Sequence, residues 1–267
     1  MDSTDVRRAA TGRPREWLGR VGLVARGVLY LLIGLLALRL ALGHRAKQAN
    51  QEGAMQDVAS HSGGFTLLLV IVIGLFAYAA WCFSQAAFGD VAKGKQTTLR
   101  IARFAAGCAY ASFGGSGVEV LAKSGGGSQA GKQQTWTARV LAHDGGRWAV
   151  ALVGLVVIGV GGYFVYQGVA RKFEEYLNLN QMTEGTRRTM TVLGVVGSIA
   201  RGAVVALSGV FVVVAAWKYD ARKARGLDGA LRTLADAWAG RLLLALAAIG
   251  LMVFGLYGLA EARYRRT

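Results

Sequence analysis

Three arginines at equivalent positions are the residues of this sequence best placed to do chemistry. Arg26, Arg103 and Arg201 each follow an alanine near the start of an apolar segment. A guanidinium presents N–H donors in a planar fork that matches the oxygens of phosphate or carboxylate groups. A charge inside an apolar segment is costly unless it meets a partner, water or a headgroup. The arginines therefore form a candidate site for anions or lipid headgroups, unless each one only extends its side chain to the membrane surface.

Catalytic and metal-binding patterns are missing from the sequence. It has no nucleophile elbow, phosphate-binding loop, zincin motif or dinucleotide fingerprint. His61 and His143 have no third ligand spaced for zinc, and Glu119 is a lone acid inside an apolar segment. We therefore expect no enzyme, no metal site and no cofactor.

The elements that carry the arginines are long apolar segments. The chain has 267 residues, of which 54% are hydrophobic and 17% charged, whereas soluble domains carry about 25% charged residues. Most of the six segments are long enough to cross a hydrocarbon core of about 30 Å. The third is the weakest, because it holds Arg103 and Glu119. We expect an all-α polytopic membrane protein with six transmembrane helices, at residues 21–42, 65–88, 101–121, 148–170, 192–217 and 242–260.

The six segments fall into three tandem repeats of two helices. The first helices of repeats one and three share one spacing of small residues around Ala-Arg-Gly, whereas repeat two has Phe104 in place of the glycine. Each second helix carries an Ile-Gly pair followed seven residues later by an aromatic residue. We expect pseudo-threefold symmetry within a single membrane domain, with a cytoplasmic tail at 1–18 and repeats at 19–90, 99–172 and 190–263.

The repeated glycines and aromatics have structural interpretations. Small residues on one helix face allow close helix contact in lipid. We assign helix packing to Gly22, Gly27, Gly34, Gly74, Gly159, Gly197, Gly202, Gly209 and Gly250. Aromatic residues near helix ends are typical of membrane interfaces. We assign that interface role to Trp81, Tyr166 and Tyr257.

A short amphipathic stretch joins the two helices of each repeat. These stretches are residues 54–59, 136–142 and 229–241, and the third repeats apolar residues at helical spacing. We expect interfacial helices here, with ordinary loops as the alternative.

The net charge of +16 indicates a membrane surface as the partner. Lys and Arg gather at the ends of apolar segments, where they meet the lipid bilayer and its anionic phospholipids. We expect no nucleic-acid binding. A modest excess of Lys and Arg on the side of the termini predicts that both termini are cytoplasmic.

Several stretches resemble a known family. The Ala-Arg-Gly opening, the linker GALRTLADAWAGR and the closing IGLMVFGLYGLAEARYRR resemble bacterial membrane proteins of the domain-of-unknown-function 1206 family, from about Gly19 to Arg266. The resemblance implies three two-helix units in a bacterial plasma membrane. It implies no activity, cofactor or catalytic residue.

Two functions remain open at this level. The first is a non-catalytic scaffold or accessory subunit that binds a membrane protein partner, based on the glycine faces and the absence of catalytic motifs. The alternative is a transporter or channel for a small or anionic solute, or a protein that binds lipid headgroups, based on the repeats and the three arginines.

Overall fold

The computed structural model is helical throughout the residues that it describes, which are 13–43, 50–89, 97–122, 137–141, 143, 145–218 and 240–265. These ranges hold no β-strand, and only one isolated bridge joins Leu177 to Arg265. The elements in chain order are α2 (Arg13–Ala41), α3 (Gln51–Ala59), α4 (Gly64–Phe88), α5 (Thr97–Leu121), α7 (Gly146–Val169), the 3₁₀ turns η1 (Lys172–Tyr176) and η2 (Leu179–Gln181), α8 (Glu184–Trp217) and α10 (Gly240–Tyr264).

Five of the described helices are long and apolar enough to cross a membrane. They are α2, α4, α7, α8 and α10. The sixth expected span corresponds to α5, which is 25 residues long but less apolar. Arg100, Arg103, Glu119 and a run of glycine and serine lower its hydropathy. The chain is therefore a multi-helix membrane protein with five clear candidate spans.

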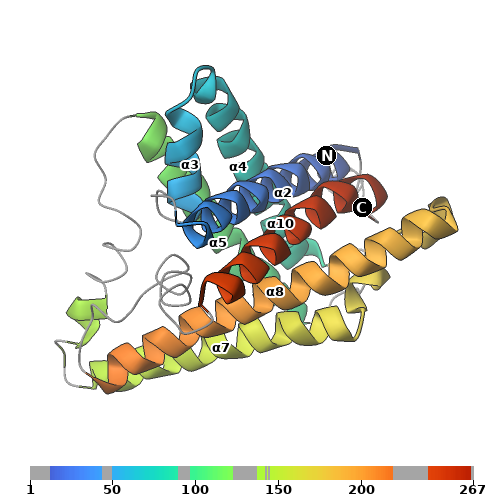
Figure 1. The fold of residues 1–267 in the computed structure, drawn as a ribbon. Coiled ribbons are helices and arrows are strands. Elements are labelled where there is room, and N and C mark those ends of the chain that lie inside the picture. Colours follow the sequence, from blue (N-terminus) through green and yellow to red (C-terminus); the bar gives the residue numbers. More distant parts are fainter. Residues whose placement is uncertain are drawn as a thin grey trace, which may run out of the picture.

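The helices pack in an order that follows the repeats. α7 packs along α8, α8 against α10, α10 along α2, α2 against α4, and α4 along α5. Figure 1 shows α2 beside α10 and α7 beside α8, with the start of α2 and the end of α10 at the same end of the molecule. Extensive packing is absent between the described residues of α5 and α7, so the cycle of helices is open there.

Glycine explains why repeats one and three have close internal crossings. A Cβ on Gly22 would collide with Tyr78, and one on Gly197 would lie 2.6 Å from the Phe254 Cα. In the same way, Gly74 faces the Ala25 Cβ and Gly250 faces the Ala200 Cβ. These pairs occupy matching positions in the two repeats, so α2 crosses α4 as α8 crosses α10.

Contacts between repeats also depend on glycine. A Cβ on Gly27 would lie 2.8 Å from the Gly255 carbonyl oxygen, and one on Gly202 would lie 2.7 Å from the Gly161 carbonyl oxygen. About two turns further along the same helix faces, Gly34 lies against Ala248 and Met252, and Gly209 lies against Gly154 and Ile158. Helix backbones thus approach closely at α2–α10 and at α8–α7, as small residues allow in lipid.

Gly159 does not have the packing role expected for it. A Cβ there meets nothing within 4 Å among the described residues. The register of α7 explains this, because α4 and α7 begin with the same turn. Gly63 and Gly145 both adopt positive φ in that turn. His61 and His143 each donate from Nδ1 to the carbonyl oxygen four residues earlier.

This shared turn aligns Gly146 with Gly64. The counterpart of Gly74 is then Val156, and the counterpart of Gly22, four residues before Arg103, is Leu99. Repeat two therefore has larger side chains where the other repeats have the paired crossing glycines. This difference explains why α5 and α7 do not cross closely.

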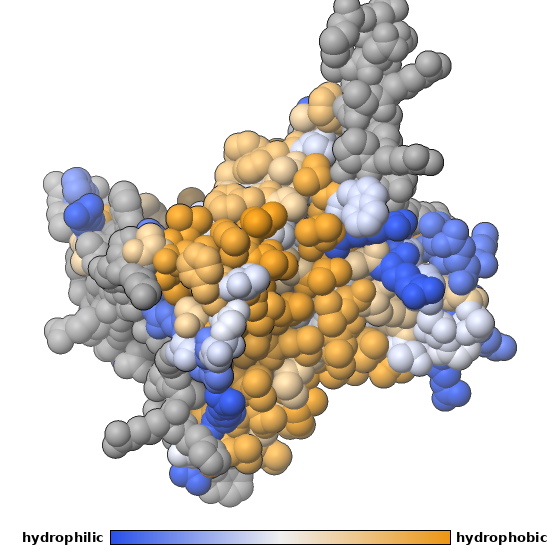
Figure 2. Space-filling view, turned by 90° about the horizontal axis from the view of Figure 1, so that it is seen from above, coloured by the Kyte–Doolittle hydropathy of each residue, from blue (hydrophilic) through white to orange (hydrophobic). Residues whose placement is uncertain are grey.

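The first linking helix is part of the bundle. In α3, the Asn50 side chain accepts a hydrogen bond from the Gly53 amide, and Ala54, Met55 and Val58 are buried. Of the second stretch, residues 137–141 are helical. Of the third, residues 229–239 lie outside the described part of the chain. Figure 2 shows a broad hydrophobic surface, with hydrophilic side chains mainly toward two opposite sides.

The link between α7 and α8 folds over one end of the bundle. The Phe173 ring packs on Tyr257 at 5.4 Å and against Gly194. Leu177 is fully buried, and the Asn178 amide donates to the Tyr264 carbonyl oxygen at 2.8 Å. The end of the bundle near the end of α10 is therefore covered by residues of this link.

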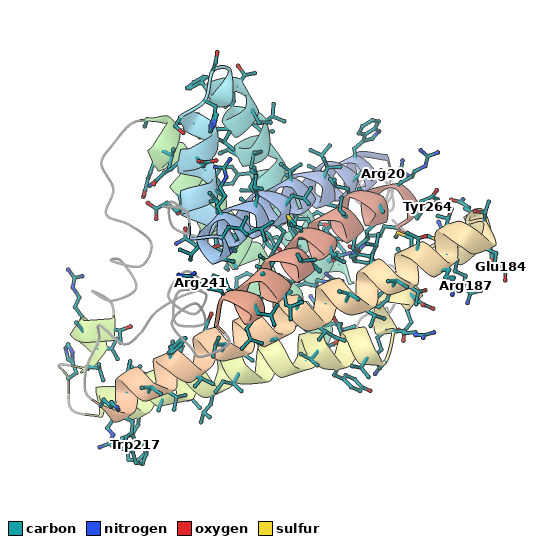
Figure 3. The ribbon with its side chains drawn as sticks, viewed as in Figure 1. Arg20, Glu184, Arg187, Trp217, Arg241 and Tyr264 are labelled. Carbon is teal, nitrogen blue, oxygen red and sulfur yellow. The ribbon has the colours of Figure 1, made fainter. Side chains whose placement is uncertain are left out.

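α8 is longer than a membrane crossing requires. Its 34 residues extend about 51 Å at 1.5 Å per residue, against a core of about 30 Å. Figure 3 shows Glu184 and Arg187 beyond Tyr264 at one end, and Trp217 at the other. The stretch from Gly202 to Trp217 spans about 24 Å, which places Arg201 toward one side of the apolar core.

Replacing Gly202 by valine should destabilise the protein, because the new side chain would meet the α7 backbone at Gly161 and Val165. Overpacking of this kind costs about 1–3 kcal/mol. Gly159→Val on α7 is the matched control and should change stability by less than about 0.5 kcal/mol. Thermal unfolding of the purified protein in detergent measures both. Equal melting temperatures for the two variants would contradict the α7–α8 packing described above.

Candidate anion-binding site

Arg26 lies inside the bundle and is held by its own repeat and by repeat three. Its side chain donates from Nη1 to the Tyr78 hydroxyl at 2.9 Å and from Nη2 to Glu261 Oε2 at 2.7 Å. Its guanidinium also lies 5.3 Å from the centre of the Phe254 ring. Only 6% of Arg26 is exposed, so it does not reach the surface along its own side chain.

Glu261 binds a second arginine from the end of the chain. Arg265 Nη1 donates to Glu261 Oε1, and both residues are buried. The Arg265 guanidinium lies 4.6 Å from the Trp81 ring and 5.1 Å from the Tyr176 ring. One carboxylate therefore bridges two guanidinium groups, from the first and last long helices.

Arg103 joins the same group through shared rings. Its guanidinium lies 5.8 Å from Trp81 and 5.6 Å from Tyr176, the two rings that Arg265 also contacts. Because Tyr176 follows α7, this contact joins the start of α5 to the end of the α7 segment. The cycle of helices is thus bridged at this end.

Arg201 has a different environment. Its guanidinium lies over three aromatic rings, at 4.1 Å from Phe164, 4.9 Å from Phe254 and 5.5 Å from Tyr30. Its Nε is buried without a hydrogen-bond partner. Among the described residues no carboxylate pairs with it. Arg201 and Arg26 share the Phe254 ring, so the structure brings the two arginines together at one level of the bundle.

Local sequence explains this common level. Arg26 follows Ala25, whose Cβ lies against Gly74, and Arg201 follows Ala200, whose Cβ lies against Gly250. The close crossing therefore fixes the residue after each alanine at the same height.

Two residues that contact these arginines or rings, Glu261 and Arg265, are not predicted by the sequence patterns described above. Their sequence is typical of a helix end followed by a basic tail. The signal that could have found Glu261 is its register. It lies 21 residues after Gly240, and Gln85 and Gln167 lie at the same distance after Gly64 and Gly146.

The aromatics differ from their expected interface role. Trp81 is 1% exposed and Tyr257 is 3% exposed, so both pack inside the bundle. Tyr166 is 51% exposed and carries Lys172 over its ring at 4.7 Å. In the register set by Gly146, the counterpart of Trp81 and Tyr257 is Tyr163. The equivalent position is thus aromatic in each repeat, but it is buried only in repeats one and three, because Tyr163 is 44% exposed.

The sequence is similar to a known protein family and to a curated bacterial protein. A family model described as Domain of Unknown Function (DUF1206) matches three segments, at residues 21–89, 101–171 and 196–265. A curated relative, the uncharacterized protein YxxB of Bacillus subtilis (strain 168), is 31% identical over 258 residues, which cover 94% of this chain and 92% of that protein. No solved structure matches the chain.

Glu261→Gln should destabilise the bundle strongly, because it leaves two buried guanidinium groups without their shared counter-charge. Breaking a buried ion pair costs about 3–5 kcal/mol. Glu184→Gln, at the exposed start of α8, is the control and should cost at most about 1 kcal/mol. The midpoint of thermal unfolding in detergent reports the difference. A melting temperature of the Glu261→Gln variant equal to that of the wild type would rule out this ion-pair network.

Proposed function

The chain belongs to the DUF1206 family, and we propose that this member is a non-catalytic integral membrane protein that binds an anionic group in its arginine cluster. The observation that carries the proposal is Arg201, a guanidinium over three aromatic rings with no carboxylate partner among the described residues. An ionisable residue inside a membrane span indicates function unless its charge is compensated.

The packing around Arg201 supports an added anion. Cation–π contacts contribute about 0.5–2 kcal/mol each, whereas an arginine near the middle of a span costs about 2.5–3.5 kcal/mol by insertion scales. Rings can offset much of that cost, but they satisfy no N–H donor. A bound phosphate or carboxylate would supply acceptors for the Nη groups of Arg201, which is only partly buried.

The packing order supports a shared, central position for this site. We propose that the three two-helix units are related by a pseudo-threefold axis, with α5 as the sixth crossing helix. Contacts from each repeat to the next in cyclic order support this arrangement. Anionic phospholipids surround such a bundle, so their headgroups are a natural source of the anion.

A second candidate is a scaffold or accessory subunit. The observation that favours it is the outer face of α7, the least buried of the five candidate spans, where Leu152, Val156 and Gly159 are exposed. A helix of a membrane protein partner could pack closely at Gly159. Cross-linking from a cysteine at Val156 in native membranes tests this, because only lipid-sized adducts are expected if no partner helix lies there.

We also propose a bacterial plasma-membrane location with cytoplasmic termini. Arg13, Arg15 and Arg20 precede the apolar part of α2, and Arg263, Arg265 and Arg266 end the chain. Lys and Arg close to span ends favour the cytoplasmic side. A C-terminal fusion to alkaline phosphatase, which is active only in the periplasm, should be inactive. An active fusion would reverse the assigned orientation.

Arg201→Gln should weaken anion binding at least tenfold and leave membrane insertion intact, because the helix after Arg201 is long enough to finish the crossing. Arg187→Gln on the same helix, exposed near its start, is the matched control and should bind normally. Retention of phosphatidylglycerol by the purified protein, measured by native mass spectrometry, gives the readout. Equal retention by the two variants would contradict the proposed function.

A further inference from the structure

Two buried tyrosines beside Arg201 have hydroxyl groups without a hydrogen-bond partner among the described residues. Tyr30 is 7% exposed and Tyr110 is 5% exposed. Neither hydroxyl has a hydrogen-bond partner within the part of the chain that the structure describes. Neither oxygen is among the fully enclosed polar atoms that lack a partner, so each one keeps some accessible surface. Buried hydroxyls in folded proteins are nearly always hydrogen-bonded, to protein or to a bound molecule.

The two tyrosines and Arg201 meet from three different repeats. The Tyr30 ring, from α2, lies 5.5 Å from the Arg201 guanidinium of α8. Tyr110, from α5, lies within electrostatic range of both Tyr30 and Arg201. The Tyr110 ring also packs edge-on against Tyr78 at 4.5 Å, and Tyr78 accepts the hydrogen bond from Arg26.

The sequence positions are consistent with this meeting point. Tyr30 stands four residues after Arg26, and Tyr110 stands seven residues after Arg103. Spacings of four and seven place residues on the same face of a helix. The first helix of each repeat therefore directs its arginine face inward, and repeats one and two add a hydroxyl to it.

We propose that Arg201, Tyr30 and Tyr110 bind one oxyanion, a carboxylate or a phosphate, with one hydrogen-bond donor from each repeat. This inference rests on the proposed function and names its ligand class and its two further contact residues. The Arg201 guanidinium carbon lies 4.1 Å from the centre of the Phe164 ring and 4.9 Å from that of Phe254. A ring compensates the charge but accepts no conventional hydrogen bond, so an oxyanion would still be needed to satisfy the N–H donors. The charge of Arg201, which no carboxylate among the described residues compensates, disfavours a cation as the ligand and favours phenol O–H donation to an anion.

The same chemistry could come from two sources. A phosphate in a lipid headgroup would enter from the bilayer, and a free anion would enter from water. Both would present oxygens to the same three donors, so one set of variants tests either source.

The experiment uses the full chain in nanodiscs. In the first arm the lipid is neutral phosphatidylcholine, and sodium phosphate or sodium acetate is titrated by calorimetry. In the second arm phosphatidylglycerol is added without phosphate, and bound lipid is counted by native mass spectrometry. ¹⁵N NMR of the arginine Nε groups, assigned with Arg201→Lys, reports directly on contact with Arg201.

The variants are Tyr30→Phe, Tyr110→Phe and the double substitution, which keep the rings and remove only the hydroxyls. Each single change should weaken binding about tenfold, because a hydrogen bond to a charged group is lost. Tyr166→Phe on the exposed face of α7 is the control and should bind like the wild type.

The outcomes separate the inference from the proposed function. Tyrosine-dependent binding in the first arm supports a free oxyanion, and such binding in the second arm alone supports a lipid headgroup. If Arg201→Gln abolishes binding while both Tyr→Phe variants bind normally, the three-donor site is wrong and the proposed function stands. If the wild type binds no anion in either arm, both fail.

Discussion

The pairing of Glu261 with Arg26 and Arg265 is the interaction on which the rest of the bundle depends. It lies at the interface between α2 and α10, which joins the first repeat to the third. Burying three charges is costly, and their mutual attraction offsets that cost only with good geometry and further hydrogen bonds. Tyr78 and the rings of Phe254 and Trp81 supply those further contacts. The aromatic interior is thus arranged around charge, although the helices that carry it are apolar.

Glycine sets where that charge can lie. Close crossings at Gly74 and Gly250 place Arg26 and Arg201 at one level, and both reach the Phe254 ring. The two arginines then differ in their surroundings, because Glu261 pairs only with the first of them. Repeat two, with Leu99 and Val156 in place of the crossing glycines, leaves its own two helices apart. One difference in side-chain size thus leaves the described parts of α5 and α7 without a close crossing.

Much of this architecture could be predicted from the sequence. Apolar length predicts the helices, and the repeated Ala-Arg-Gly predicts that Arg26 and Arg201 are equivalent. The register of α7 could not be read from the Ile-Gly pair, because the start of that helix is fixed by a turn at Gly145 with positive φ. Glu261 was also hidden, since its partner Arg26 is 235 residues away and no local pattern links them. The three rings around Arg201 come from α2, α7 and α10, so they meet only in the folded protein.

The separation of Arg26 from Glu261 also has a consequence for biosynthesis. A ribosome adds about 5–20 residues per second, so roughly 10–50 seconds pass between the synthesis of α2 and that of α10. During that interval the first helix holds an arginine whose counter-charge does not yet exist. Until the last helix is inserted, this arginine must be kept by water, by headgroups or by the insertion machinery. The final helix then supplies the counter-charge of the first, so a chain truncated before α10 would leave Arg26 without Glu261.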